Sequence, residues 1–126
     1  MKQMKIIIAG SRDISRSDFS DIMFSDTPQK IIYEYPGNEI EIVSGHAKGV
    51  DTFGEEWARR NELPIKTFPA DWAKYGKSAG PLRNGQMADY ADMLIAIWDG
   101  KSRGTRDMIN KMLDRGKETH VYVVIE

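Results

Sequence analysis

Five short apolar runs alternate with longer amphipathic segments along the chain. The apolar runs are rich in β-branched residues, and several are continuously apolar, which is typical of strands buried on both faces of a parallel sheet. The predicted strands are 4–9, 40–44, 65–69, 93–98 and 120–125. The predicted helices are 15–35 with a break near residues 26–28, then 50–62, 81–91 and 105–116. This alternation predicts an open α/β sheet with right-handed crossovers, formed as a single domain over residues 1–126.

One connection is longer than the others. Residues 70–80 join the third predicted strand to its helix, whereas such loops usually have about two to six residues. Long loops in compact domains are often functional lids, so residues 70–80 are a candidate part of a binding site.

Composition restricts the functions that the chain can have. The 126 residues are 40% hydrophobic with a formal net charge of −1, which suits a globular domain and does not favour a nucleic-acid partner. The absence of cysteine excludes disulfides, thiolate metal sites and cysteine nucleophiles. His46 and His120 are far apart in sequence, so no metal site is indicated, and no cofactor is expected. No apolar run is long enough for a signal peptide or a membrane span, and we expect a cytoplasmic protein.

A ligand is expected at the loops that follow the strands. In an open α/β sheet, ligands bind beyond the carboxyl ends of the strands, where the strand order reverses. The four strand-to-helix loops are 9–13, 44–51, 70–84 and 99–105. They hold many of the basic groups on one rim of a slightly acidic chain, and this distribution favours an anionic ligand.

The first loop combines a small residue with a hydroxyl and a cation. Gly10 allows a close turn, Ser11 supplies a hydroxyl, and Arg12 can pair with phosphate or carboxylate oxygens at two points. The alternative is that Ser11 or Asp13 caps the following helix.

In the second loop, Gly45 and Gly49 surround a helix start whose free N–H groups form an anion site. Lys48 adds a positive charge, and Asp51 is either the N-cap of the helix or an acceptor for ribose hydroxyls. The spacing matches neither the dinucleotide fingerprint nor the Walker loop. His46 is interpreted as a loop residue rather than a catalytic base.

The third loop has side chains that are suited to binding a base and a phosphate. Trp72 and Tyr75 can stack on a base, while Lys77, Arg83 and Asn84 can hold phosphate. The alternative is a structural loop in which Trp72 fills the edge of the core.

The fourth loop repeats the pattern of glycines and cations. Gly100 and Gly104 permit tight turns, Thr105 can cap the next helix, and Lys101 and Arg103 are basic. A basic run by itself is usually a solvated surface, and its place beside three similar loops is what makes it a candidate site.

The other notable residues are interpreted as structural. Trp57 is assigned to the core or an interface, and the adjacent acids Glu55 and Glu56 to a solvated helix face that points away from the strand ends. The methionines at core spacing are Met87, Met93, Met108 and Met112.

The loop sequences resemble those of the SLOG superfamily, and in particular its small stand-alone domains related to YspA and YpsA, which are often found in bacteria and phages. The matching segments are GSR, SGHAKGVD, FPADWAKYGKSAGPLRN and ADMLIAIWDGKSRGT, in that order over about 100 residues. The resemblance implies a Rossmann-like, mainly parallel sheet of five strands in the order 3-2-1-4-5, with helices on both faces. It is also compatible with a homo-oligomer, which is common among SLOG proteins.

The resemblance also suggests roles for the loops. It places Gly10, Ser11 and Arg12 at a pocket floor, and Gly104 with Thr105 in a phosphate-binding turn. It matches the small-residue loop to Gly45, Lys48, Gly49 and Asp51.

The chain departs from the phosphoribohydrolases of this superfamily in two parts of their motif, and Gly100-Lys101-Ser102-Arg103 replaces the Pro-Gly-Gly part. Their motif PGGxGTxxE has a glutamate three residues after the threonine, where this chain has Met108. Asp107 is one position short, so on a helix its side chain points about 100° away from the expected direction. Cleavage of an N-glycosidic bond needs a placed carboxylate, and the candidates are Asp51, Asp71, Asp99 and Asp107.

We therefore expect a module that binds a nucleotide or nucleotide-derived small molecule, as a sensor or a sequestering protein in a phage or defence setting. The alternative is an N-glycosidic phosphoribohydrolase that acts on a nucleoside monophosphate, and a third hypothesis is binding of single-stranded DNA. The predicted ligand-binding residues are Gly10, Ser11, Arg12, Ser44, Gly45, Lys48, Gly49, Asp51, Trp72, Tyr75, Lys77, Arg83, Asn84, Asp99, Gly100, Ser102, Arg103, Gly104 and Thr105.

Overall fold

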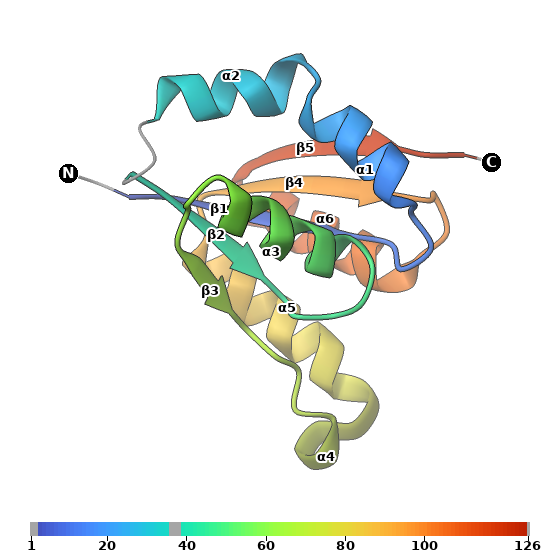
Figure 1. Ribbon diagram of the computed structural model, residues 1–126. Helices are drawn as coiled ribbons and strands as arrows, with labels where there is room; N and C mark the ends of the chain where they lie inside the picture. The colour runs from blue at the N-terminus through green and yellow to red at the C-terminus, as the bar shows by residue number, and fades with distance from the viewer. Residues whose placement is uncertain (1–2, 36–38, 126) are drawn as a thin grey trace.

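The computed structural model describes residues 3–35 and 39–125, which form an α/β fold around one five-stranded sheet (Figure 1). The strand order is β3-β2-β1-β4-β5, and all four neighbouring pairs are parallel. The strands are β1 (Met4–Gly10), β2 (Ile40–Ser44), β3 (Ile65–Thr67), β4 (Met93–Trp98) and β5 (Glu118–Val123). The predicted Rossmann-like topology and strand order are confirmed.

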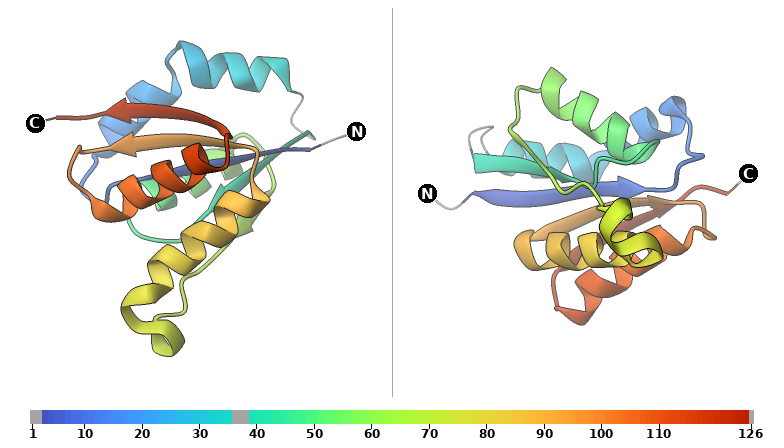
Figure 2. Two further views of the ribbon diagram at one scale, coloured as in Figure 1. Left: turned by 180° about the vertical axis from the view of Figure 1, so that it is seen from behind. Right: turned by 90° about the horizontal axis from the view of Figure 1, so that it is seen from below.

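Helices cover both faces of the sheet. Figure 2 shows α1, α2 and α3 on one side of the strands, with α5 and α6 on the other. The helical segments are α1 (Arg16–Met23), α2 (Asp26–Glu34), α3 (Val50–Arg60), α4 (Trp72–Tyr75), the 3₁₀ turn η2 (Gly76–Ser78), α5 (Ala79–Tyr90) and α6 (Arg103–Asp114). The predicted break in the first helical segment separates α1 from α2, and Pro28 lies in the first turn of α2, where its missing N–H costs no helical hydrogen bond.

Side chains of the central strands alternate between two cores. Ile6 and Ile8 of β1 belong to the core under α1, α2 and α3, whereas Ile7 belongs to the core under α5 and α6. Ile7 pairs in register with Val43 of β2 and Leu94 of β4, and all three are fully buried. Burial on both faces explains why these strands are continuously apolar in sequence.

The predicted long loop contains regular structure. Residues 72–78 form α4 and η2, which lead directly into α5. The carboxylate of Asp71 begins this segment by accepting a hydrogen bond from the Lys74 N–H at 3.1 Å. The segment therefore projects from the carboxyl edge of the sheet as two helical turns rather than as an open loop (Figure 1).

Among the described residues, no helix is both long and apolar enough to cross a membrane.

Candidate functional site

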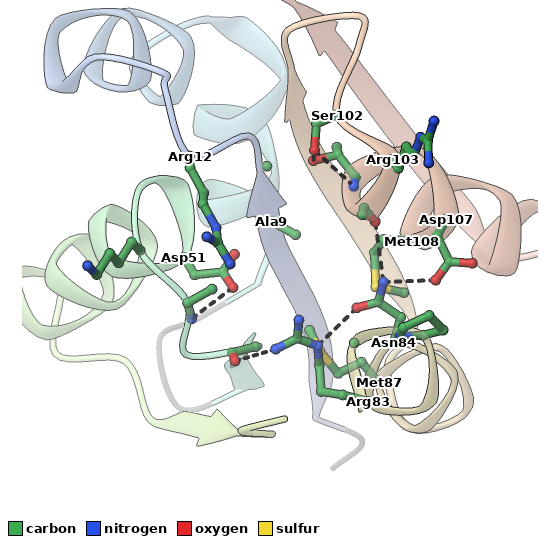
Figure 3. A pocket seen from close by; sticks show the side chains of 18 of the residues that line it. Ala9, Arg12, Asp51, Arg83, Asn84, Met87, Ser102, Arg103, Asp107 and Met108 are labelled. Carbon is green, nitrogen blue, oxygen red and sulfur yellow. Dashed lines mark hydrogen bonds between the residues drawn. The ribbon is translucent and has the colours of Figure 1, made fainter. Parts of the chain in front are cut away.

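A cleft of about 740 Å³ opens at the carboxyl ends of β1 and β4. These strands are neighbours in the sheet, but the chain leaves β1 toward α1 on one face and leaves β4 toward α6 on the other. The two connections diverge at this point, which is where open α/β sheets bind their ligands. Figure 3 shows Arg12 and Asp51 on the wall formed by β1 and α3, and Arg103 and Asp107 on the opposite wall at α6.

Most of the predicted site residues meet at this cleft, although they come from all four loops. Those that line it are Gly10, Arg12, Gly45, Lys48, Asp51, Trp72, Arg83, Asn84, Asp99, Ser102, Arg103, Gly104 and Thr105, together with the candidate acid Asp107.

Two predicted serines do not line the cleft, because their hydroxyls form hydrogen bonds within the protein. Ser11 is buried, and its Oγ accepts a hydrogen bond from the backbone N–H of Asp99 at 3.1 Å, which joins the first loop to the fourth. Ser44 is also buried, and its Oγ donates to the Glu55 carboxylate at 2.7 Å. Both serines hold the loops in place rather than facing a ligand.

Two predicted glycines shape the backbone beside the cleft without lining it. Gly49 has a φ of +80°, and a Cβ at this position would lie 2.7 Å from both the Cα and the carbonyl oxygen of Arg12. The close approach of the second loop to the first therefore requires glycine here. Gly100 has a φ of +81° at the turn after β4.

Three further predicted residues lie outside the lining of the cleft. Tyr75 and Lys77 belong to α4 and η2, and both are exposed. Tyr75 instead stacks with the Lys74 ammonium, which lies 5.1 Å from the ring centroid. Asp71 is the N-cap of α4, so it is not placed as an acid for chemistry in the cleft.

Sequence reasoning missed several lining residues, most of them small or apolar. Met87 and Met108 are buried core residues that also form the apolar part of the lining, which only the packing of α5 beside α6 reveals. The other missed residues are Ala9, Asp13, Ala47, Gly80 and Pro81, and Lys101, already identified as a cation of the fourth loop, also lines the cleft.

Asp51 is the most buried acid of the cleft. It lies in the first turn of α3 and is 7% exposed, and its carboxylate accepts the Ala47 N–H at 3.2 Å. Burial raises the pKa of Asp51 to about 6 because it disfavours the charged form, while the Ala47 hydrogen bond and the positive charge of Arg83 act in the opposite direction. A carboxyl group with this pKa exchanges a proton close to neutral pH.

A line of hydrogen bonds crosses the cleft from the second loop to α6 (Figure 3). Arg83 donates to the carbonyl oxygen of Gly45 at 2.5 Å and to the side-chain oxygen of Asn84 at 3.0 Å. Asn84 in turn donates to the Asp107 carboxylate at 2.9 Å, and Lys111 donates to the same carboxylate at 2.6 Å. Asp107 is therefore held by two partners, which leaves it less available as a catalytic acid.

Asp99 and Ser102 organise the start of α6. The Asp99 carboxylate accepts the N–H groups of Lys101 at 2.8 Å and Ser102 at 2.7 Å, and these bonds lower the pKa of Asp99. The Ser102 hydroxyl accepts the N–H of Thr105 at 3.5 Å as the N-cap of the helix. Asp99 therefore stays ionised as a backbone acceptor, which is the wrong state for a proton donor.

The sequence predicts a solvated helix face for Glu55 and Glu56, and this prediction is wrong for Glu55. Glu55 is 4% exposed, and its Oε2 lies 2.9 Å from His46 Nδ1 in addition to its bond with Ser44. Glu56 lies nearer the surface and pairs with Arg16. The missed signal is helical spacing, because Glu55 is four residues after Asp51 and therefore shares its inward-facing side.

Positive charge in the cleft is not neutralised by direct pairing. Within residues 3–35 and 39–125, the five lining cations form no ion pair with a carboxylate: Arg12, Lys48, Arg83, Lys101 and Arg103. The described part of the chain also contains no group of three potential metal-ligating side chains. These cations share the cleft with four aspartates, Asp13, Asp51, Asp99 and Asp107.

Comparisons with known proteins agree with this architecture. The chain is 36% identical over 81 residues to the Gene 61 protein of Mycobacterium phage D29, and the match covers 60% of this chain and 65% of that protein. The X-ray structure of DNA processing protein A (DprA) from Streptococcus pneumoniae has the same fold, with a TM-score of 0.69 at 19% identity. That match covers 95% of this chain and 50% of the DprA chain.

The family comparison rests on sequence and covers more than half of the chain. Residues 4–75 match the model of the YspA, cpYpsA-related SLOG family, and they include the first two loops of the cleft and Trp72. The protein therefore belongs to the YspA, cpYpsA-related SLOG family.

Proposed function

We propose that the cleft binds a nucleotide or a nucleotide-derived small molecule through its phosphate, and that the protein senses or sequesters this ligand. The observation that carries the proposal is the set of unpaired cations on both walls of a cleft at the switch point of the sheet. Such an arrangement focuses a positive potential on the space where the helix starts meet.

The two walls supply complementary contacts for a phosphate. Arg12 extends from the β1 side, and Arg103 begins α6 on the other side. The first turn of α6 lines the same space with Arg103, Gly104 and Thr105, so the positive end of its dipole would favour a phosphate there. An arginine fork on each side would bind phosphate oxygens at two points, which favours phosphate over a singly charged anion.

The rest of the ligand would use the less polar surfaces. Met87 and Met108 offer an apolar surface for a sugar or a base. Trp72 lines the cleft and is 54% exposed, so its indole is free to stack on a base. Asp51 and Asp99 are the candidate acceptors for sugar hydroxyls.

Calorimetric titration with the common ribonucleoside 5′-monophosphates tests the proposal. Arg12→Ala and Arg103→Ala should each weaken binding by more than ~1.5 kcal/mol, because each removes a charge-assisted hydrogen bond. Lys30→Ala, on the exposed face of α2, is the matched loss of a cation and should leave affinity unchanged. Unchanged affinity in both arginine variants would refute the phosphate site.

A nucleic-acid ligand is the competing outcome of the same titration. Oligothymidylate should bind more weakly than the best mononucleotide. Tighter binding that falls steeply with salt concentration would favour single-stranded DNA and reject the small-molecule proposal.

The raised pKa of Asp51 supports a second candidate function, an N-glycosidic phosphoribohydrolase. A neutral Asp51 carboxyl would protonate the departing base as the N-glycosidic bond breaks, and water would add to C1′ to give the free base and ribose phosphate. Chromatography of free base after incubation with a nucleoside monophosphate tests this function, and Asp51→Asn should abolish the release. Tight binding without release of base would reject it.

A further inference from the structure

A side groove of about 450 Å³ adjoins the main cleft and has a different charge character. The two spaces share Arg12, Lys48, Trp72 and Arg83, so they are continuous. The main cleft is lined by four aspartates, whereas the side groove is lined by no carboxylate among the described residues. The groove extends past Thr52 of α3 toward the segment that follows β3.

Two arginines converge where the groove meets the cleft. Arg83 is partly buried, and burial lowers its pKa; the negative charge of Asp51 acts in the opposite direction, and the positive charge of Arg12 lowers the pKa further. Two guanidinium groups that repel one another are stabilised by an anion that both can contact. Lys48 adds a third positive charge that has no carboxylate partner in the described part of the chain.

His46 is oriented toward the same groove by a buried acid. Its backbone has a φ of +59°, which is uncommon for a residue other than glycine, and its Nδ1 lies 2.9 Å from the Glu55 carboxylate. The tautomer with its proton on Nδ1 donates a hydrogen bond to this carboxylate. Among the described residues Nε2 makes no hydrogen bond, and with protons on both ring nitrogens it would donate to an oxyanion in the groove.

We propose that the side groove is a second oxyanion subsite, and that the ligand is a nucleotide with two phosphate groups, one in each space. Arg12 and Arg83 would contact the second phosphate where the two spaces join, and Lys48 and His46 would contact it within the groove. This inference rests on the proposed function of the main cleft. It adds that a nucleoside monophosphate fills only part of the site.

The test compares the best-binding nucleoside 5′-monophosphate with its 5′-diphosphate and its 3′,5′-bisphosphate by calorimetry. At least one doubly phosphorylated form should bind about tenfold more tightly, as expected for one additional charge-assisted contact. Equal affinities would overturn the second subsite and leave the proposed function intact.

Two substitutions of Thr52 test whether the gain arises in the groove. Thr52 is exposed in the first turn of α3, where an acid is compatible with the helix dipole. Thr52→Glu places a carboxylate among the cations, and Thr52→Gln is the neutral variant of the same size. The gain should fall much further in the Glu variant than in the Gln variant, and an equal gain in the two would overturn the proposal.

Failure of the proposed function is detected separately. If no monophosphate binds, the nucleotide proposal fails, and inorganic phosphate then tests the subsite by itself. The ³¹P resonance of phosphate should broaden in the presence of the wild-type protein and broaden less with Thr52→Glu. Equal broadening with both proteins would overturn the subsite.

Discussion

Asp51→Asn should stabilise the protein above pH 6 because it removes a charge that folding buries. The carboxylate is 7% exposed, and its neighbours only partly offset the loss of solvation. Asparagine has nearly the same shape, and its side-chain oxygen can still accept the Ala47 N–H. The substitution therefore tests charge with little change in packing.

The size of the effect follows from the pKa of Asp51. Folding raises it from 3.8 to about 6, and each pKa unit corresponds to ~1.4 kcal/mol, so the ionised form is destabilised by about 3 kcal/mol. Below pH 3.8 the proton is bound in both the folded and the unfolded chain, and no cost arises. The wild-type protein therefore loses this stability as the pH rises through about 6, whereas Asp51→Asn does not.

Urea denaturation of both proteins at pH 4 and pH 8 measures this difference. The free energy of unfolding of Asp51→Asn, relative to wild type, should be about 2 kcal/mol more favourable at pH 8 than at pH 4, because the unfolded aspartate is already partly ionised at pH 4. Any packing cost of the amide is common to both pH values and cancels. Asp21→Asn, on the exposed side of α1, is the surface control. A relative stability of Asp51→Asn that is the same at both pH values would refute this account of the buried charge.

The remaining predictions concern stability and use paired variants. Gly49→Ala should destabilise the fold by about 2 kcal/mol or more, because its Cβ would overlap the Arg12 backbone at a positive φ, and urea denaturation measures it. Gly104→Ala should stabilise by about 0.5–1 kcal/mol, because it lies in α6 with open space around it; a loss as large as that of Gly49→Ala would contradict the packing argument. Glu55→Ala should lower the melting temperature far more than Glu56→Ala, since it leaves buried polar partners unsatisfied. Equal shifts in the two glutamate variants would show that Glu55 is not a buried anchor.

The fold could be predicted because its information is local in sequence. Continuous apolar runs identify strands that are buried on both faces, and the helical segments between them allow few topologies for a parallel sheet. The convergence of Arg12, Lys48 and Arg103 also follows from the topology, since parallel strands end at one edge. The strand order alone is therefore enough to predict that these three cations lie in one cleft.

The features of the cleft that the sequence does not predict depend on contacts between elements. Helical spacing places Glu55 on the inward-facing side of α3 with Asp51, but its hydrogen bond with Ser44 of β2 depends on how α3 packs against the sheet. The sequence predicts that Trp72 or Tyr75 covers a base, and the helical turn at α4 places Trp72 in the lining of the cleft and Tyr75 outside it. Met108 has the sequence signature of a core residue, and its second role as part of the cleft lining depends on how α6 packs beside α5.

The hydrogen-bonded line from Gly45 through Arg83 and Asn84 to Asp107 fixes the distance between the walls of the cleft before any ligand arrives. Folding already orders these side chains, so the entropic cost of ordering them is not added to the free energy of ligand binding. Because the distance between the walls is fixed, a ligand too long to fit between them is excluded. Such a ligand could widen the cleft only by breaking these hydrogen bonds. Substitution of Asn84 would therefore broaden the range of accepted ligands, even though the residue lies between the walls rather than on either of them.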